Sequence, residues 1–188
     1  MTGLLTLSAV PTTICVYVGS RPGTRPEYAA AVRELGAEVG RRGLRLVYGG
    51  GSEGLMGVLA DAALGADAEV VGVIPQRLVD RERAHRGISD LLIVDTLHER
   101  KAAMAERADA FLAAPGGIGT LEELIEMLSW SQLRLHDKPC GLLSVEGYFD
   151  LLVAWLNHAV AEGFVPEADR SLLRVAASPA ALLDSLNS

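Results

Sequence analysis

The sequence predicts a doubly wound, Rossmann-like α/β fold, with a mostly parallel sheet and helices on both faces, in a single domain. Three observations support this prediction. Short apolar runs rich in β-branched residues alternate with longer helical patterns along the 188 residues. The runs are continuously apolar, which is typical of parallel strands buried on both faces. Gly-rich segments follow several of them directly, at strand-to-helix junctions. No linker or internal repeat divides the chain.

Each predicted strand is an apolar run bounded by turn residues, and a helical pattern follows most of these runs. Pro26 suits a first helical turn, Gly43 ends the first helix, and Pro75 closes the third strand. The predicted strands span residues 14–18, 44–48, 69–74, 91–94, 110–113, 141–144 and 173–176. The predicted helices span about residues 26–42, 53–64, 96–107, 120–133, 148–162 and 179–186.

Composition restricts the class of protein. The net charge of −7 argues against non-specific binding to nucleic acid or to an anionic membrane. Cys15 and Cys140 lie in apolar runs, so we expect buried, reduced thiols and a cytoplasmic location. No apolar run reaches the roughly 18 residues of a membrane span. Residues 1–12 are expected to form a flexible leader before the domain of residues 13–188.

Two Gly-rich loops are candidate phosphate cradles. One joins a predicted strand to a helix through Gly49, Gly50, Gly51 and Ser52, and the other does so through residues 115–120 (PGGIGT), which include Gly116. Glycine lets backbone amides approach a ligand closely, and the following helix offers unpaired N–H groups. The hydroxyls of Ser20, Ser52 and Thr120 are further candidate donors. The glycines could instead only make sharp turns, but two such loops at one edge of a sheet favour a nucleotide phosphate.

A dinucleotide site is a weaker interpretation of the first loop. Gly49, Gly51 and Gly54 match G-x-G-x-x-G, a motif that requires an acidic residue at the end of the next strand. The nearest candidates, Asp67 and Glu69, lie at or before the start of that strand. The sequence therefore disfavours an oxidoreductase.

Glu123 and Arg100 are the candidate catalytic side chains. Glu123 lies one helical turn after the second loop, where a carboxylate could stabilise an oxocarbenium-like transition state or activate water. Thr120 and Glu123 also fit a capping box, so a purely structural role stays open. Arg100 falls on a stripe with Leu97, Met104 and Ala108 that should be buried, and it needs an anionic partner there: a ligand phosphate or Glu123. A snorkelling side chain or an internal ion pair is the alternative.

No metal or organic cofactor is predicted. The four histidines show no metal-ligand spacing, and no nucleophile-histidine arrangement is recognisable. Glu122 and Glu126, four residues apart, are interpreted as a solvated helix face.

Several segments together resemble the LONELY GUY (LOG) family of phosphoribohydrolases. Residues 115–123 (PGGIGTLEE) are similar to the family signature P-G-G-x-G-T-x-x-E, and residues 98–104 (HERKAAM) resemble its upstream Arg-Lys segment. The similarity runs from about residue 14 to residue 177. Shorter agreements occur at residues 48–57 (YGGGSEGLMG), 72–75 (GVIP), 81–82 (RE) and 136–139 (HDKP).

The resemblance implies hydrolysis of the N-glycosidic bond of N6-modified adenosine 5′-monophosphates (cytokinin nucleotides), or of AMP itself, to the free base and ribose 5-phosphate. It implies catalytic roles for Arg100 and Glu123, and at least a homodimer with sites near the interface. It implies substrate contacts from Glu82, Lys101, Gly117, Ile118, Gly119, Thr120, Leu121, Glu122 and Ser129.

Departures from the family pattern concern substrate preference more than reaction type. Glu53 stands where a small or apolar residue is usual, Gln76 where Lys is common, and Arg134 where Gly is common. A carboxylate at Glu53 would repel a phosphate unless it points away. The family has also been labelled lysine decarboxylase, but only Lys101 and Lys138 are present, and neither is in a context that suggests a Schiff base.

The competing function is a non-catalytic nucleotide-binding or carrier protein of the same fold. Such a protein needs the glycines but not the carboxylate of Glu123.

Overall fold

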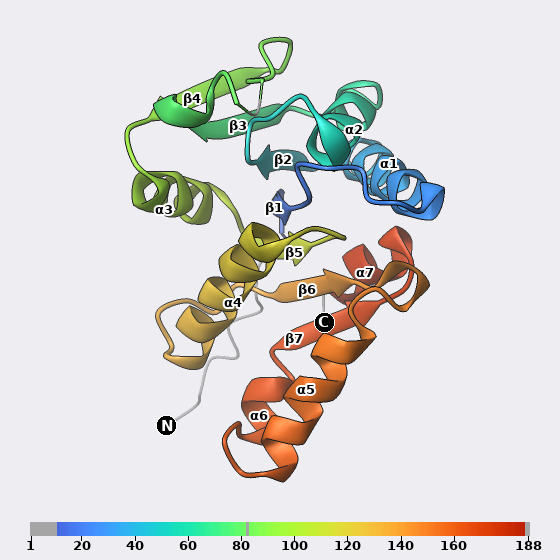
Figure 1. Ribbon diagram of the computed structural model, residues 1–188, viewed down its shortest axis with the longest axis vertical. Coiled ribbons are helices and arrows are strands. Elements are labelled where there is room, and N and C mark those ends of the chain that lie inside the picture. The colour runs from blue at the N-terminus through green and yellow to red at the C-terminus, as the bar shows by residue number, and fades with distance from the viewer. Residues whose placement is uncertain (1–10, 82, 187–188) are drawn as a thin grey trace, which may run out of the picture.

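The computed structural model describes residues 11–81 and 83–186, and its centre is one sheet of seven parallel strands (Figure 1). The strands are arranged in the order β4-β3-β2-β1-β5-β6-β7. They are β1 (Thr13–Tyr17), β2 (Arg45–Tyr48), β3 (Val70–Pro75), β4 (Asp90–Val94), β5 (Ala110–Ala113), β6 (Cys140–Leu143) and β7 (Leu173–Ala176).

Helices cover both faces of the sheet, and each face has its own apolar core. Helices α1 (Pro26–Arg41), α2 (Gly54–Leu64) and α7 (Pro179–Ser185) pack on one face. Helices α3 (Leu97–Arg107), α4 (Ile118–Gln132) and α5 (Asp150–Ala161) pack on the other. The predicted Rossmann-like fold, with helices on both faces, is confirmed.

The strand order reverses direction between β1 and β5. From β1 the chain proceeds to β2, β3 and β4 on one side of the sheet, and it then returns to pair β5 with β1 on the other side. Such a switch point opens a crevice beyond the carboxyl ends of the two strands, where ligands bind in open α/β sheets. The segments that follow β1 and β5 therefore occupy the position of a ligand site.

All predicted strand and helix boundaries agree with the structure to within two residues. Two details differ from the prediction. Helix α4 begins at Ile118, with Gly117 as its N-cap, so Thr120 is the third helical residue and does not cap the helix. The capping-box interpretation of Thr120 and Glu123 is therefore wrong. The short helix α6 (Glu167–Arg170) was not predicted.

The start of β1 is held by Asp109, which precedes β5. One oxygen of Asp109, Oδ2, accepts hydrogen bonds from the backbone N–H groups of Thr12 and Thr13, each at 2.9 Å, and from the Thr12 hydroxyl at 2.8 Å. Burial alone would raise the pKa of this carboxyl, but the hydrogen bonds from Thr12 and Thr13 outweigh burial and lower it. The predicted leader, residues 1–12, lies outside the described residues except for Pro11 and Thr12.

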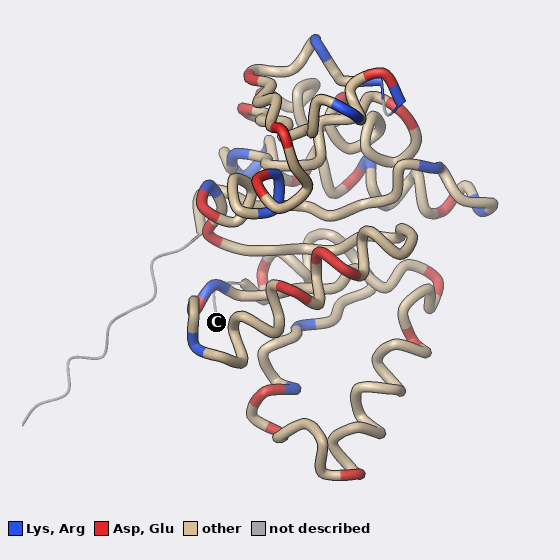
Figure 2. Tube along the Cα trace, turned by 60° about the vertical axis from the view of Figure 1, so that its left-hand side comes forward, with Lys and Arg blue, Asp and Glu red and all other residues tan. Residues whose placement is uncertain are grey.

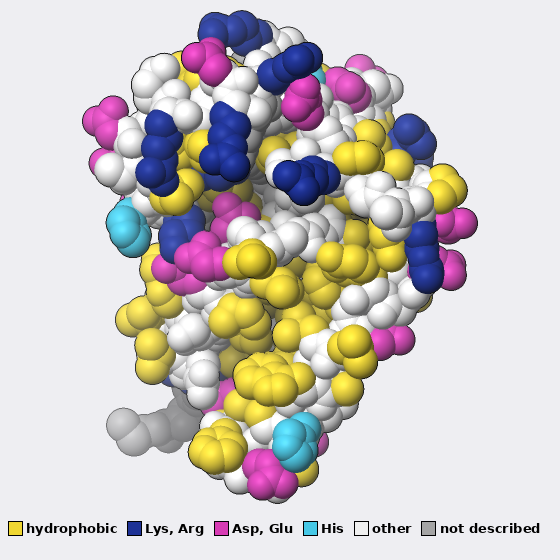
Figure 3. Space-filling model, viewed as in Figure 1, with side chains coloured by type: hydrophobic (Ala, Val, Ile, Leu, Met, Phe, Trp, Pro, Cys, Tyr) yellow, Lys and Arg dark blue, Asp and Glu magenta, His cyan; other side chains and the backbone are white. Residues whose placement is uncertain are grey.

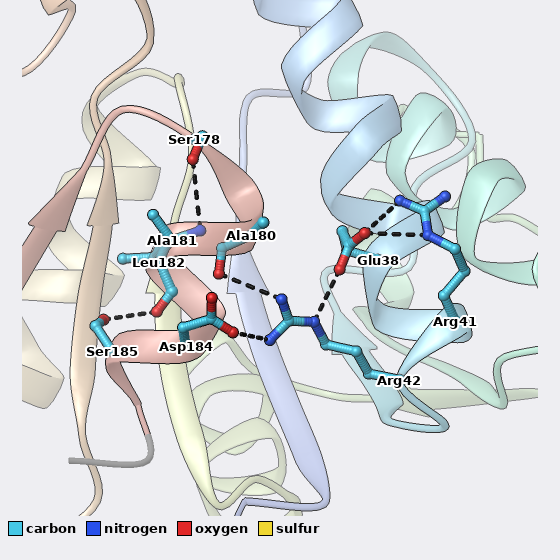
Figure 4. Close-up of polar contacts among 9 residues, drawn as sticks. All are labelled: Glu38, Arg41, Arg42, Ser178, Ala180, Ala181, Leu182, Asp184 and Ser185. Carbon is cyan, nitrogen blue, oxygen red and sulfur yellow. Dashed lines mark hydrogen bonds and ion pairs between the residues drawn. The ribbon is translucent and has the colours of Figure 1, made fainter.

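A charged network joins the end of α1 to α7 (Figure 4). These two helices lie on the face of the sheet opposite to α3, α4 and α5. Arg42 bridges Glu38 on α1, at 2.8 Å, and Asp184 on α7, at 2.7 Å. Its guanidinium also donates to the carbonyl oxygen of Ala180. The network fixes α7 beside α1, although the two helices are distant in sequence.

Both cysteines are free and buried, as predicted. Burial raises the pKa of the Cys140 thiol to about 12 and raises that of Cys15 further. Both thiols therefore stay protonated at neutral pH. Among the described residues, no helix combines the length and the apolar composition that a membrane span requires.

Candidate active site

A cleft of about 720 Å³ lies at the switch point of the sheet. Its lining comes from the segments that follow β1 and β5, from the start of α2, and from single side chains of other elements. The lining residues are Val18, Gly19, Ser20, Arg21, Pro22, Gly23, Tyr28, Leu55, Met56, Arg81, Arg100, Pro115, Gly116, Gly117, Ile118, Gly119, Thr120, Glu123 and Tyr148.

The N-terminus of α4 opens into this cleft. Gly117 is the N-cap, and no side chain caps the helix. The first intrahelical bond is donated by Leu121 to the carbonyl oxygen of Gly117, so the N–H groups of residues 118–120 have no intrahelical partner. A helix N-terminus of this kind, with its positive dipole end, attracts anions. The predicted loop of residues 115–120 therefore lies where it could hold a phosphate.

Glycine at position 116 is required by close backbone packing. A Cβ atom there would lie 2.1 Å from the Thr120 hydroxyl oxygen and 2.9 Å from the backbone nitrogen of Gly19. Gly19 in turn donates to the carbonyl oxygen of Pro115, at 3.1 Å. The loop after β1 and the loop after β5 are thus packed against each other at their glycines. This contact brings Ser20 and Thr120 into the lining of one cleft.

Arg100 projects from α3 to the cleft and is only 7% exposed. Its Nε donates to the carbonyl oxygen of Val73 at 3.1 Å, and its Nη2 donates to that of Gly49 at 3.0 Å. Met104 and Ala108 on the same stripe are buried as predicted, whereas Leu97, the first residue of α3, is 39% exposed. The guanidinium is therefore fixed to the sheet edge by two backbone carbonyls, which the sequence did not reveal.

Glu123 lines the same cleft from the second turn of α4 and is half-buried. Tyr17, the last residue of β1, and Cys15, in the middle of that strand, are buried in the core on the same face of the sheet as α4. Burial is the main cause of the raised pKa of Tyr17, and the neighbouring Cys15 and the Glu123 carboxylate raise it further. Because the pKa of Cys15 is raised as well, the groups beneath Glu123 stay neutral at neutral pH.

The other predicted cradle does not line the cleft. Gly49 accepts the bond from Arg100, and Gly50 accepts one from the backbone N–H of His85. Both the backbone N–H and the hydroxyl of Ser52 donate to the carbonyl oxygen of Arg83, and Gly51 forms a β-bridge with Ala84. Residues 49–52 are thus tied to the segment of residues 83–85.

Glu53, a departure from the family pattern, points to the same segment. Its carboxylate pairs with Arg83 at 2.9 Å, and Glu53 is not among the residues that line the cleft. It therefore does not oppose an anion bound there.

Lys101 and Glu122, two of the residues expected to contact substrate, are bound to each other. Lys101 Nζ on α3 pairs with Glu122 on α4, and it also lies 3.0 Å from Glu126 Oε2. Neither Lys101 nor Glu122 lines the cleft. The interpretation of Glu122 and Glu126 as only a solvated face is wrong, because they hold a lysine of the neighbouring helix.

The remaining predicted substrate residues have different surroundings. Ile118 lines the cleft and is 89% exposed. Leu121 is half-buried, packs on the core between the sheet and α4, and does not line the cleft. Ser129 is exposed and lies two turns further along α4 than Glu123. Glu82 lies outside the described residues.

Among the lining side chains with polar groups, four were not proposed from the sequence: Arg21, Arg81, Tyr28 and Tyr148. No hydrogen bond or ion pair joins Arg21 or Arg81 to another described residue. Tyr148 donates its hydroxyl to the carbonyl oxygen of Gly116 at 2.5 Å and meets the ring of Tyr28 edge to face at 5.3 Å. Arg81 could have been found, since it belongs to the Arg-Glu pair at residues 81–82 that resembles the family.

Charge is unevenly divided along the chain (Figure 2). Thirteen basic and thirteen acidic residues precede Ala108, whereas four basic and eleven acidic residues follow. Basic side chains gather on the β2–β4 side of the hollowed face (Figure 3). Three arginines and one glutamate line the cleft, so it is locally positive in an acidic protein.

No group of three or more His, Cys, Asp or Glu side chains that could hold a metal ion occurs within residues 11–81 and 83–186. His136 has a neutral ring: its Nε2–H donates to the carbonyl oxygen of Met127 at 3.0 Å, and its Nδ1 accepts from the backbone N–H of Lys138 at 3.1 Å. Burial is the main cause of its lowered pKa.

The fold and the cleft together define a class: a Rossmann-like protein with an anion-attracting cleft at the topological switch point, beside a carboxylate and a fixed guanidinium. The family model described as "Possible lysine decarboxylase" matches residues 56–186. Similar proteins with names include LOG enzymes. Cytokinin riboside 5′-monophosphate phosphoribohydrolase LOG1 of Arabidopsis thaliana is 46% identical over 173 residues, which are 92% of this chain and 81% of that protein. The enzyme LOG of Oryza sativa subsp. japonica is 48% identical over 160 residues, 85% of this chain and 66% of that protein. The chain belongs to the LOG family.

Solved structures with the same fold share little sequence with this chain. The molybdenum cofactor binding protein of Rippkaea orientalis has a TM-score of 0.70 at 20% identity, covering 96% of this chain and all of that one. The molybdenum cofactor carrier protein of Chlamydomonas reinhardtii has a TM-score of 0.70 at 21% identity, covering 92% and 94%. At these identities the likeness supports the fold alone.

Proposed function

We propose that the cleft binds a nucleoside 5′-monophosphate with an N6-modified adenine, a cytokinin nucleotide, and hydrolyses its N-glycosidic bond. Water and the nucleotide give the free base and ribose 5-phosphate. The observation that carries this proposal is that Glu123 and Arg100 line the same cleft as the open N-terminus of α4. Membership of a family whose named relatives are phosphoribohydrolases supports it.

The phosphate is assigned to the start of α4. The unpaired N–H groups of residues 118–120 and the hydroxyls of Ser20 and Thr120 are the donors. Arg21 and Arg81 supply positive charge at the same cleft, and no internal ion pair occupies them among the described residues. Because the dipole contributes only about 0.3–1 kcal/mol at each contact, several donors and cations have to act together.

We assign to Glu123 a position facing the anomeric carbon of the bound ribose. It lies on the second turn of α4, so a phosphate at the helix start places the ribose within reach of this carboxylate. The carboxylate stabilises the oxocarbenium-like transition state or removes a proton from the attacking water, an effect of about 10²–10⁴-fold. Arg100 is held in place before substrate arrives, because Val73 and Gly49 already bind its guanidinium.

The base is assigned to the apolar part of the lining. Leu55 and Met56 at the start of α2, Ile118, and the rings of Tyr28 and Tyr148 offer surface for a purine with an apolar N6 substituent. The volume of about 720 Å³ falls within the roughly 300–1,000 Å³ of small-molecule sites. We assign no metal and no organic cofactor to the reaction.

Both lysines of the chain are engaged outside the cleft, which disfavours decarboxylation through a Schiff base. Lys101 pairs with Glu122 and Glu126. Lys138 donates to the carbonyl oxygen of Ala105 at 2.8 Å and lies over the ring of Phe111. Neither lysine lines the cleft.

We further propose that the enzyme is cytoplasmic and acts as a homodimer with its sites near the interface. Large apolar side chains are exposed beside the cleft and along α4 and its end: Ile118, Ile125, Leu133 and Leu135. Large apolar side chains left exposed are typical of a subunit interface when they gather into one patch. Sedimentation of the purified chain tests the assembly, and a monomer at micromolar concentration contradicts it.

A product assay tests the function. The protein is incubated with isopentenyladenosine monophosphate, with AMP, and with the unphosphorylated riboside, and the free base and ribose 5-phosphate are separated by chromatography. We expect base release from a monophosphate and little from the riboside. Binding without release would instead indicate a nucleotide-binding or carrier protein. Equal cleavage of riboside and nucleotide would contradict the assignment of the phosphate site.

A further inference from the structure

A bridge between α3 and α4 lies directly next to the two candidate catalytic residues. Lys101 follows Arg100 on α3, and Glu122 precedes Glu123 on α4. Lys101 Nζ contacts the carboxylates of both Glu122 and Glu126, which lie one helical turn apart on the same side of α4. The two helices lie on the same face of the sheet (Figure 1).

This bridge is more enclosed than an ordinary surface ion pair. The side chain of Lys101 is 12% exposed and that of Glu126 is 27% exposed, whereas Glu122 is half exposed. Burial on its own would lower the pKa of Lys101, but the hydrogen bonds to Glu122 and Glu126 outweigh burial and raise it. The lysine therefore stays charged over the whole neutral range.

Two carboxylates already neutralise the single ammonium group, so the cluster carries a net negative charge. Such a cluster offers nothing to a substrate phosphate. Lys101 and Glu122 are also absent from the lining of the cleft. What the bridge can do is fix the spacing and rotation of the first turn of α3, which carries Arg100, against the second turn of α4, which carries Glu123.

We propose that Lys101 is a positioning residue: its bridge to Glu122 and Glu126 sets the geometry of Arg100 against Glu123 across the cleft. This inference rests on the proposed hydrolase function. It reassigns Lys101 and Glu122 from substrate contacts to a link between helices. A displacement of about 1 Å between reacting groups can cost roughly 10²-fold in rate, so a link of this kind has a measurable effect on turnover.

The test is a steady-state comparison of variants with isopentenyladenosine monophosphate as substrate. We expect Lys101→Met to lower kcat by roughly 10- to 100-fold and to change KM by less than about twofold. Lys101→Arg keeps the charge and is expected to retain most of the activity. The exchanged pair Lys101→Glu with Glu122→Lys restores the bridge and is expected to recover kcat relative to Lys101→Glu alone. Arg107→Met, which removes a basic residue from the exposed side of α3, is the matched control.

Thermal unfolding shows whether each variant is folded. If Lys101→Met does not fold, Glu126→Gln is used in its place, because it removes one charged partner without changing the shape of the side chain. A raised KM with unchanged kcat would show that Lys101 contacts the substrate and would overturn the proposal. So would an unchanged kcat, or an exchanged pair no better than Lys101→Glu. Wild-type turnover is measured first. If the wild-type protein releases no base, the proposed function is wrong. If the wild type is active and Lys101→Met is equally active, only the positioning role is contradicted.

Discussion

Arg100 Nη2 donates a hydrogen bond to the carbonyl oxygen of Gly49, 3.0 Å away, across the edge of the sheet. A Cβ atom at position 49 would lie 2.0 Å from the same nitrogen, so only glycine leaves room for the guanidinium. The Gly-rich loop after β2 thus holds the arginine, and the Gly-rich loop after β5 opens into the cleft. The loops after β2 and after β5 therefore differ in their contacts, although both are rich in glycine.

Replacing Arg100 by alanine is expected to impair both stability and turnover. The carbonyl groups of Val73 and Gly49 would lose their donor in a buried setting, which costs about 1–3 kcal/mol. Urea unfolding measures this loss, and the product assay measures the accompanying fall in turnover. Arg107→Ala is the control, since among the described residues the Arg107 side chain donates only to the carbonyl oxygen of Ala103 within α3. A change within about 0.5 kcal/mol is expected there. Full activity of Arg100→Ala would contradict its catalytic assignment.

Alanine at two neighbouring glycines is expected to lower stability to very different extents. At Gly116 the added methyl group meets the Thr120 hydroxyl and the backbone of Gly19, so the loop has to shift and the protein is destabilised. At Gly117 nothing lies within 4 Å, so the fold is retained. If a phosphate is seated on the N-terminus of α4, the methyl group of Gly117→Ala meets the ligand instead. Because Gly117 is also the N-cap of α4, where alanine is less favourable than glycine, we expect a loss of only about 1 kcal/mol in stability. AMP binding is expected to weaken, as titration calorimetry would measure.

The fold was predictable because its signals are local and repeated. Apolar runs closed by Pro75 or by glycine marked the strands, and the Gly-rich turns marked the edge where β1 and β5 end. The start of α4 was misplaced because Thr120 and Glu123 match a capping box, whereas the helix begins at Ile118 with glycine as its cap. Gly116 packs against the backbone of Gly19 just before that start, a contact between distant segments that no local sequence pattern expresses.

The site was predictable only in part, for a related reason. Arg100 and Glu123 were found from their types and positions, and both line the cleft. The hydrogen-bond acceptors for Arg100 are backbone carbonyls of β3 and of the loop after β2. Every residue has such a carbonyl, so the residue types in the sequence do not indicate which ones bind Arg100. Likewise, the meeting of Lys101 with Glu122 depends on how two helices lie side by side, which periodicity within one helix does not show.

Removing the hydroxyl of Tyr148 is expected to weaken catalysis without disturbing the aromatic contacts. The hydroxyl holds the carbonyl of Gly116, and since a peptide unit is planar it also fixes the N–H of Gly117. Tyr148→Phe keeps the edge contacts with Tyr28 and Phe149. Loss of one hydrogen bond of about 0.5–1.5 kcal/mol corresponds to a fall of about 2- to 10-fold in kcat/KM. Tyr28→Phe is the control; an equal effect there would show that the bond to Gly116 is not responsible.

Stability is expected to fall in mild acid because of His136. Burial, assisted by the nearby charge of Lys138, lowers its pKa in the folded protein below the usual 6.5. The unfolded chain therefore binds a proton first as the pH falls, and stability decreases from about pH 6.5 down to the lowered pKa of the folded state. Urea unfolding at pH 7.5 and pH 5.5 measures the decrease. His136→Asn, which cannot be protonated, is expected to show a smaller one; an equal decrease would assign the effect to other groups.

Glu123→Gln is expected to abolish turnover while binding is largely retained. The amide has nearly the shape of the carboxylate, but it can neither accept a proton from water nor offset the positive charge of an oxocarbenium-like transition state. A loss of about 10²–10⁴-fold in kcat is expected, with AMP affinity changed little because the phosphate donors lie at the start of α4. Glu106→Gln, an exposed carboxylate on α3, is the matched control. If Glu123→Gln bound AMP poorly and turned over normally when saturated, the carboxylate would be a binding group, and the acid at the anomeric carbon would have to be sought elsewhere.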